Sequence, residues 1–187
     1  MGIVICMQED TDENLIKRAC NGDSDAFSSL ISRHYTMIFK VAYKWCGTQE
    51  DAEDIAQEVS IKLAKNLDKF DFKSKFTTWL YRVVMNTAKD CQRKNNRKEG
   101  RELPMFEDVS FASEEPTPDQ KVAMQEVLQE VHNLSDTLKE AVLLVCWEGL
   151  THKEAADILE CKESTVSWRI HEARKQLEPL LKERRVS

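Results

Sequence analysis

Residues 151–177 read THKEAADILECKESTVSWRIHEARKQL, and this pattern predicts two short helices joined by a tight turn. Thr151 can cap the first helix, and Glu154 three residues later completes a capping box. After a short break, Ser164 or Thr165 can cap a second helix. The apolar residues of that helix fall on one helical stripe: Val166, Ile170, Ala173 and Leu177. The stretch therefore has the form of a helix-turn-helix unit.

The face opposite that stripe is polar and partly basic, with Ser167, Trp168, Arg169, His171, Glu172, Arg174 and Lys175. A helix that buries one side and presents such a face can lie in the major groove of DNA. The same pattern also occurs in ordinary helical hairpins at protein surfaces. This segment alone leaves both interpretations open.

The composition favours helices throughout the chain. Of 187 residues, 41% are apolar and 32% charged, while only 5 are glycine and 4 are proline. We predict an all-α protein with two small helical domains, at residues 12–98 and 121–187, after a tail at 1–11. Residues 99–120 hold three of the four prolines and seven acidic side chains, which predicts a flexible acidic linker between the domains.

The charge is distributed unevenly along the chain. The net charge is −6, but residues 61–101 carry a net +8 and residues 161–187 a net +3, with the acidic residues 102–160 between them. Two separate basic segments suggest two contacts with nucleic acid. Charge that alternates by chance on a solvated helical surface is the alternative interpretation.

The six cysteines indicate neither a disulfide framework nor a metal site. None forms a CxxC pair, and Cys146, His152, Cys161 and His171 match no spacing of zinc ligands. The apolar N-terminus is too short for a signal core, and no other stretch is long enough to span a membrane. We therefore expect reduced thiols in a cytoplasmic protein that has no cofactor, no metal and no membrane insertion of its own.

Residues 48–67 predict a helix with one acidic side. Thr48 can cap this helix, with Asp51 at the capping-box position. The inward positions are Ala52, Ile55, Val59 and Leu63. Asp51, Asp54 and Glu58 lie at i, i+3 and i+7, and we call these three residues the acidic ridge. Like charges one turn apart weaken an isolated helix, so the ridge suggests a basic partner, although a plain solvated face is the alternative.

A second long helix, predicted from about residue 77 to residue 97, carries the opposite charge. Its buried positions are Leu80, Val84, Thr87, Ala88 and Cys91. Its polar positions are Arg82, Asn86, Lys89 and Arg93, which we call the basic stripe, with Arg97 as a continuation. The aromatic residues near its start are Phe70, Phe72, Phe76, Trp79 and Tyr81. Cations beside aromatic rings suit a phosphate backbone with unstacked bases, although most of the five rings are expected in the core.

Three motifs in this order resemble one protein family. DAEDIAQEVSIKL (51–63), KFTTWLYRVVMNTAKD (75–90) and the helix-turn-helix at 151–177 are similar to the extracytoplasmic-function class of bacterial RNA polymerase sigma factors. The resemblance extends from about residue 12 to about residue 181. It implies that the first domain is sigma region 2, that the second is sigma region 4, and that the chain directs promoter-specific transcription initiation.

The resemblance also implies a set of contacts with polymerase and promoter DNA. The residues implied for the β′ coiled coil of core RNA polymerase are Asp51, Asp54, Gln57 and Glu58. Those implied for the −10 element, with its flipped non-template base, are Lys73, Lys75, Arg82, Asn86, Lys89 and Arg93. Those implied for the duplex −35 element are Ser164, Thr165, Ser167, Trp168, Arg169, His171, Glu172 and Arg174. Region 4 would also meet the β flap, and the linker would run towards the RNA exit path.

Several residues depart from the family pattern. Ser167 and Glu172 stand where basic residues are common, and Trp168 stands where a small polar residue is usual. Ser164 replaces a common glycine, and in the first domain Ser60 replaces a common phenylalanine. Fewer cations on the second helix predict either a different −35 sequence or weak −35 binding. Glu172 either accepts a hydrogen bond from cytosine N4 or faces away from the bases.

The resemblance also predicts a regulatory partner and leaves other functions open. Sigma factors of this class are usually held inactive by an anti-sigma factor, often anchored in the inner membrane. A sigma-like decoy that binds an anti-sigma factor without directing transcription is one alternative, and a stand-alone repressor of duplex operators is another. The sequence shows no nucleophile–base pair, no catalytic carboxylate pair and no glycine-rich phosphate loop, so we expect no enzyme.

Overall fold

The computed structural model describes residues 10–98 and 127–183, and every regular element in these ranges is helical. The first domain contains α1 (Asp12–Cys20), α2 (Ser24–Cys46), α3 (Gln49–Asn66), the 3-10 turn η1 (Leu67–Lys69) and α4 (Phe76–Lys98). The second contains the helical residues 127–132, α6 (Asp136–Val142), the π-helical turn η2 (Leu143–Trp147), α7 (His152–Leu159) and α8 (Glu163–Glu183). The all-α prediction is confirmed. The linker predicted at 99–120 and most of the tail at 1–11 lie outside the described residues, and the domain limits stay a prediction.

Side-chain caps fix where the helices of the first domain begin. The Thr11 hydroxyl accepts the Asn14 N–H at the start of α1, and the Asp23 carboxylate accepts two N–H groups of the first turn of α2. The predicted Thr48 cap of α3 is confirmed. The long α2 is capped at its C-terminal end by Gly47, whose φ of 88° is a backbone conformation that favours glycine.

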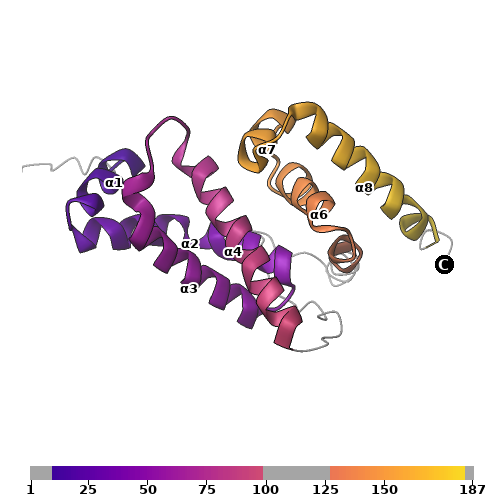
Figure 1. The fold of residues 1–187 in the computed structure, drawn as a ribbon, viewed down its shortest axis with the longest axis horizontal. Helices are drawn as coiled ribbons and strands as arrows, with labels where there is room; N and C mark the ends of the chain where they lie inside the picture. Colours follow the sequence, from indigo (N-terminus) through magenta and orange to yellow (C-terminus); the bar gives the residue numbers. More distant parts are fainter. Residues whose placement is uncertain (1–9, 99–126, 184–187) are drawn as a thin grey trace, which may run out of the picture.

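The core of the first domain lies where α2, α3 and α4 pack against one another (Figure 1). Trp45 is fully buried there, and its indole Nε1 donates to Gln92 Oε1 at 2.9 Å. The inward positions predicted for α3 are all buried, as are those predicted for α4 except the half-buried Cys91. Helical spacing in residues 26–45 predicts an inward position for Tyr35 together with Leu30 and Ile38, and for Tyr35 this prediction is wrong. Its ring is exposed and stacks on Phe39 at a centroid distance of 6.3 Å.

The second domain contains the predicted helix-turn-helix as α7 and α8. Thr151 and Glu154 form the expected capping box at the start of α7. The cap predicted for α8 is wrong, because the helix begins at Glu163, before either Ser164 or Thr165. The Lys162 carbonyl accepts the first helical N–H groups, including that of Thr165 at 2.9 Å.

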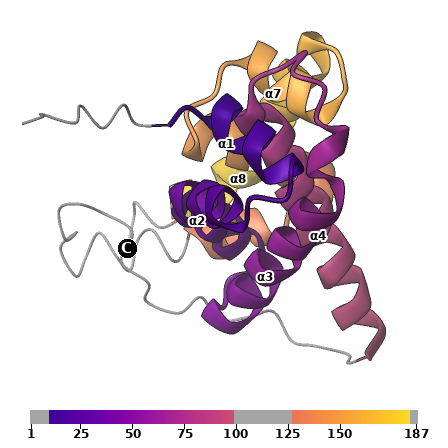
Figure 2. The same ribbon diagram turned by 90° about the vertical axis from the view of Figure 1, so that its left-hand side faces the viewer.

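The two domains lie side by side, with α7 against α4 (Figures 1 and 2). Lys139 of α6 is fully buried at their junction. Its Nζ donates to the Trp45 carbonyl at 2.6 Å and lies 4.4 Å from the centre of the Trp45 ring. Burial lowers the pKa of Lys139 to about 8. Among the described helices, none combines the length and the apolar character that crossing a membrane requires.

Candidate nucleic-acid and polymerase interface

The acidic ridge lies along one side of α3. Asp54 and its neighbour Gln57 are exposed, whereas Asp51 and Glu58 are half-buried. Asp51 also stabilises the start of α3. Its carboxylate accepts a hydrogen bond from the Thr48 hydroxyl at 2.8 Å, and the Asp51 N–H donates to the same hydroxyl. Asp54 and Glu58 are therefore the members of the ridge most available to a basic partner.

The basic stripe lies on the side of α4 that faces away from the core of the first domain. Asn86 and Arg93 are exposed, whereas Arg82 and Lys89 are half-buried because the second domain covers them. The side chain of Arg97 lies outside the part of the chain that is described.

The loop at residues 71–75 connects the η1 turn to α4 and carries two exposed cations, Lys73 and Lys75. Lys73 Nζ lies 2.6 Å from Asp71 Oδ2, and this carboxylate raises the pKa of Lys73. Lys75 extends towards the second domain, where Glu154 lies 3.7 Å away. The loop therefore places positive charge at the start of the basic stripe.

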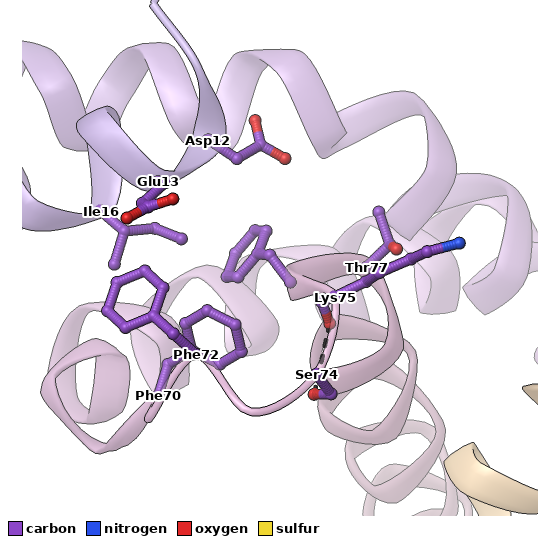
Figure 3. A pocket seen from close by; sticks show the side chains of 9 residues that line it. Asp12, Glu13, Ile16, Phe70, Phe72, Ser74, Lys75 and Thr77 are labelled. Carbon is purple, nitrogen blue, oxygen red and sulfur yellow. Dashed lines mark hydrogen bonds between the residues drawn. The ribbon is translucent and has the colours of Figure 1, made fainter.

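A cavity of about 320 Å³ opens between this loop and α1 (Figure 3). Its walls combine the rings of Phe70, Phe72 and Phe76 with the polar side chains of Asp12, Glu13, Ser74 and Thr77. The rings pack on one another, with centroids 4.8 Å apart for Phe70 and Phe72. An aromatic wall beside hydrogen-bonding groups is suited to a flat, polar, heterocyclic ligand.

The two carboxylates of this cavity are both neutralised by cations. Asp12 contacts Arg33 Nη1 and His34 Nε2, each at 2.8 Å. Glu13 contacts Lys17 Nζ at 2.6 Å. The cavity is therefore suited to an uncharged group that donates hydrogen bonds, such as a nucleobase, rather than to a cation.

Phe72 differs from the other rings of the cavity. Phe70 and Phe76 are buried as expected, whereas the Phe72 side chain is 45% exposed. Its backbone has φ 58, in the left-handed region that costs a residue with a Cβ about 1–2 kcal/mol. Strain of this kind is found at binding sites more often than elsewhere, so Phe72 is a candidate contact residue.

The residues predicted for the −35 element lie on α8, and most of them face solvent. Those exposed are Ser164, Ser167, Trp168, His171 and Arg174, and those half-buried are Thr165, Arg169 and Glu172. Trp168 is 60% exposed and lies opposite the buried Val166 and Ile170. A large ring in the centre of an exposed helix face is the main feature that this helix offers a partner.

Two residues of this set are held by neighbours within the protein. The Ser167 hydroxyl lies 2.8 Å from His152 Nδ1 of α7 and donates to the Glu163 carbonyl. Glu172 accepts a hydrogen bond from Gln176 Nε2 at 3.0 Å. These contacts fix the two side chains before any partner binds.

The residues through which the two domains meet were not predicted from the sequence. Acidic side chains of the second domain reach cations of the first, as in the pair of Glu148 with Lys44. The opposite net charges of residues 61–101 and 131–160 were the signal that could have indicated the pairs of Arg82 with Glu160 and of Lys89 with Glu140. The surfaces predicted to bind polymerase, the −10 element and the −35 element thus lie on α3, α4 and α8, respectively. The second domain packs against α4.

Comparison with known proteins identifies the family of this chain. The family described as Sigma-70 region 2 matches residues 30–98, and the family described as Sigma-70, region 4 matches residues 124–177. The ECF RNA polymerase sigma-E factor of Haemophilus influenzae is 32% identical, covering 90% of this chain and 94% of that protein. The ECF RNA polymerase sigma factor SigW of Bacillus subtilis is 31% identical, covering 90% of this chain and 95% of that protein.

A solved structure has the same fold. The sigma factor RpoE of Bartonella quintana, crystallised with the anti-sigma factor NepR, superposes with a TM-score of 0.68 at 22% identity. The match covers 83% of this chain and 96% of that one. Both sigma regions and nearly the whole length of the relatives are therefore present, and the chain belongs to the extracytoplasmic-function (ECF) RNA polymerase sigma factors.

Proposed function

We propose that this protein is a promoter-specificity subunit without a catalytic site, which acts in the cytoplasm. The observation that carries the proposal is the geometry of α4: its first residues, Phe76 and Thr77, line the aromatic cavity (Figure 3), and Arg82 begins the basic stripe about one and a half turns later. A strand of DNA can follow the cations with its phosphates while one base enters the cavity. The acidic ridge on α3 supplies the attachment to core polymerase, and region 4 adds a contact with the β flap.

The three predicted surfaces divide the work between single-stranded and duplex DNA. The loop at 71–75 and the basic stripe bind the melted −10 element, and the cavity holds a flipped non-template base. The exposed face of α8 binds the −35 element in the major groove. Since α8 has few exposed cations, apolar contact and hydrogen bonds contribute more to −35 recognition than phosphate pairing does.

An anti-sigma factor is the proposed regulator of this protein. The Bartonella protein with this fold was crystallised with an anti-sigma factor, and we propose that this chain binds a partner of the same kind. Membrane anchorage, where it occurs, would belong to the partner rather than to this protein.

The direct test is run-off transcription with purified core polymerase on fragmented genomic DNA, with start sites determined by sequencing. We expect new start sites that share two short upstream elements. Binding to core without new start sites would favour the decoy, and tight duplex binding in the absence of core would favour the repressor.

Replacing Phe72 by alanine is expected to weaken binding of a −10 single strand about tenfold, because stacking of one base on a ring is worth about 1–3 kcal/mol. The measurement is fluorescence anisotropy with a labelled non-template oligonucleotide from a promoter found in the run-off experiment. Phe72→Trp keeps a stacking surface and should bind like the unaltered protein. Equal affinity for all three proteins would remove Phe72 from the proposed site.

Replacing Trp168 by alanine is expected to weaken binding of the −35 duplex about tenfold, since burying a large apolar side chain is worth about 1.5–3 kcal/mol. A ring in the major groove contacts thymine methyl groups. Each thymine of the element is therefore replaced in turn by deoxyuridine, which lacks the methyl group. At one position this replacement should weaken binding of the unaltered protein as much as Trp168→Ala does, and it should not affect binding of the Trp168→Ala variant. A Trp168→Ala variant with undiminished −35 affinity would show that the ring faces another partner.

A further inference from the structure

Four carboxylates of the second domain reach polar groups of the first domain, and we call them the acidic face: Glu140, Glu148, Glu154 and Glu160. They come from α6, from the end of η2, and from the two ends of α7. Of these elements, α7 packs against α4, and the two helices lie side by side in Figure 1. Glu160 and Glu140 pair with Arg82 and Lys89 of the basic stripe. The acidic face therefore lies over the side of α4 that carries the basic stripe.

Glu148 of the acidic face contacts two polar side chains of the first domain. Its carboxylate accepts hydrogen bonds from Lys44 Nζ at 2.7 Å and from Tyr81 Oη at 2.9 Å. The Lys44 and Glu148 side chains are each only 14% exposed, so salt and water screen this ion pair weakly. The π-helical turn brings Glu148 here, because the Glu148 N–H bonds to the Leu143 carbonyl five residues earlier.

Arg82, the first cation of the basic stripe, is held by the end of α7. Its Nη1 lies 2.9 Å from Glu160 Oε1, and Nη2 donates to the Asp157 carbonyl. Glu160 has φ 51, so the backbone is strained where its carboxylate meets Arg82. The Nε of Arg82 is buried without a hydrogen-bond partner among the described residues, so the contact satisfies this guanidinium incompletely. Because the guanidinium of Arg82 is not fully hydrogen-bonded in this contact, breaking the contact costs less than breaking a fully hydrogen-bonded ion pair.

Two more cations of the −10 set are occupied in the same way. Lys89 Nζ lies 2.6 Å from Glu140 Oε1, and the Glu140 side chain is only 7% exposed. Lys75 lies 3.7 Å from Glu154 in an exposed and weaker pair. Three of the five cations assigned to the −10 element thus face a carboxylate of the second domain.

A DNA phosphate and a carboxylate need the same N–H donors of lysine and arginine. The second domain also covers the approach to Arg82 and Lys89, so a strand and the acidic face cannot occupy the basic stripe together. We propose that the acidic face takes the place of −10 DNA in the free protein, holding region 4 over region 2 until the two separate. This inference rests on the proposed role of α4 in −10 recognition.

The test weakens the acidic face without touching the basic stripe. In the full chain, Glu148→Gln and Glu160→Gln together keep side-chain size and remove two charges. Two properties are measured without polymerase: the radius of gyration by small-angle X-ray scattering, and the affinity for a labelled pool of random-sequence 20-nucleotide single strands. Phosphate pairing does not depend on sequence, so the pool reports access to the basic stripe. We expect a larger radius and about tenfold tighter binding.

The matched control carries Glu53→Gln and Glu178→Gln, which make the same change in net charge at positions that form no part of the acidic face. It should keep the radius and the affinity of the unaltered protein. Equal tightening in variant and control, or no tightening in the variant, would overturn the inference. Run-off transcription with the same proteins tests the proposed function separately: absence of start sites for all of them refutes that function, whereas the radius still reports whether the acidic face closes the protein.

Discussion

Replacing both Asp54 and Glu58 by lysine is expected to lower the affinity of this protein for core RNA polymerase at least a hundredfold. Both carboxylates lie on the same side of α3, and each reversal turns an attraction to a basic surface into a repulsion. A loss of about 1.4 kcal/mol of binding free energy at each site lowers the affinity tenfold, so the two sites together lower it about a hundredfold. The measurement is displacement of a fluorescent reference sigma factor from core polymerase.

Glu53 on the same helix supplies the matched control. It is exposed, but it lies about 100° around the helix from Asp54, outside the acidic ridge. Glu53→Lys should therefore leave core affinity within about twofold, and circular dichroism should show that all variants remain helical. Asp51 is unsuitable for this test, because its replacement would also remove the hydrogen bond to Thr48. Equal affinity of Asp54→Lys/Glu58→Lys and the unaltered protein would place the polymerase contact elsewhere.

Replacing Arg82 and Lys89 by alanine is expected to reduce promoter opening at least a hundredfold. Hydrogen bonds from charged donors are worth about 1.5–3 kcal/mol each, and both cations lie on the basic stripe. Permanganate reactivity of thymines in the melted region measures opening, and run-off transcription measures its consequence. The salt dependence of binding should also become shallower, because fewer phosphates are paired.

Lys94 is the control for this prediction. It is exposed on the same helix, about 120° away from the basic stripe. Lys94→Ala should open the promoter normally. Removing Arg82 and Lys89 also removes their pairs with Glu160 and Glu140, which favours an open arrangement of the domains. A loss of activity would therefore come from the missing DNA contacts, and retained opening would contradict the assignment of α4.

Local signals in the sequence predicted much of the fold. The caps at Thr48 and Thr151 were predictable because a short side chain and its N–H partner lie within three residues of each other. The start of α8 was not predictable in this way, because the helix begins directly after Lys162, whose side chain is not one that caps helices. The exposure of Tyr35 was missed because helical periodicity does not show where a partner helix stops covering a stripe.

The candidate site was predictable as separate surfaces but not as an assembled molecule. The acidic ridge and the basic stripe follow from helical spacing on single helices. The pairing of Arg82 with Glu160 joins residues 78 positions apart, and no local pattern specifies it. The cavity depends likewise on Asp12 of α1 meeting Phe72 of the distant loop.

Cys46, next to Trp45 at the domain junction, gives the protein a native chemical reporter. Its thiol donates to the Thr48 carbonyl, and burial raises its pKa to about 12, so almost none of it is the nucleophilic thiolate at neutral pH. Cys20 and Cys146 are exposed and serve as internal references for alkylation. Because Lys139 of the second domain binds the Trp45 carbonyl next to Cys46, we expect separation of the domains to uncover this thiol. Its alkylation rate, followed by mass spectrometry, therefore records opening in the unlabelled, unaltered protein as polymerase or DNA is added.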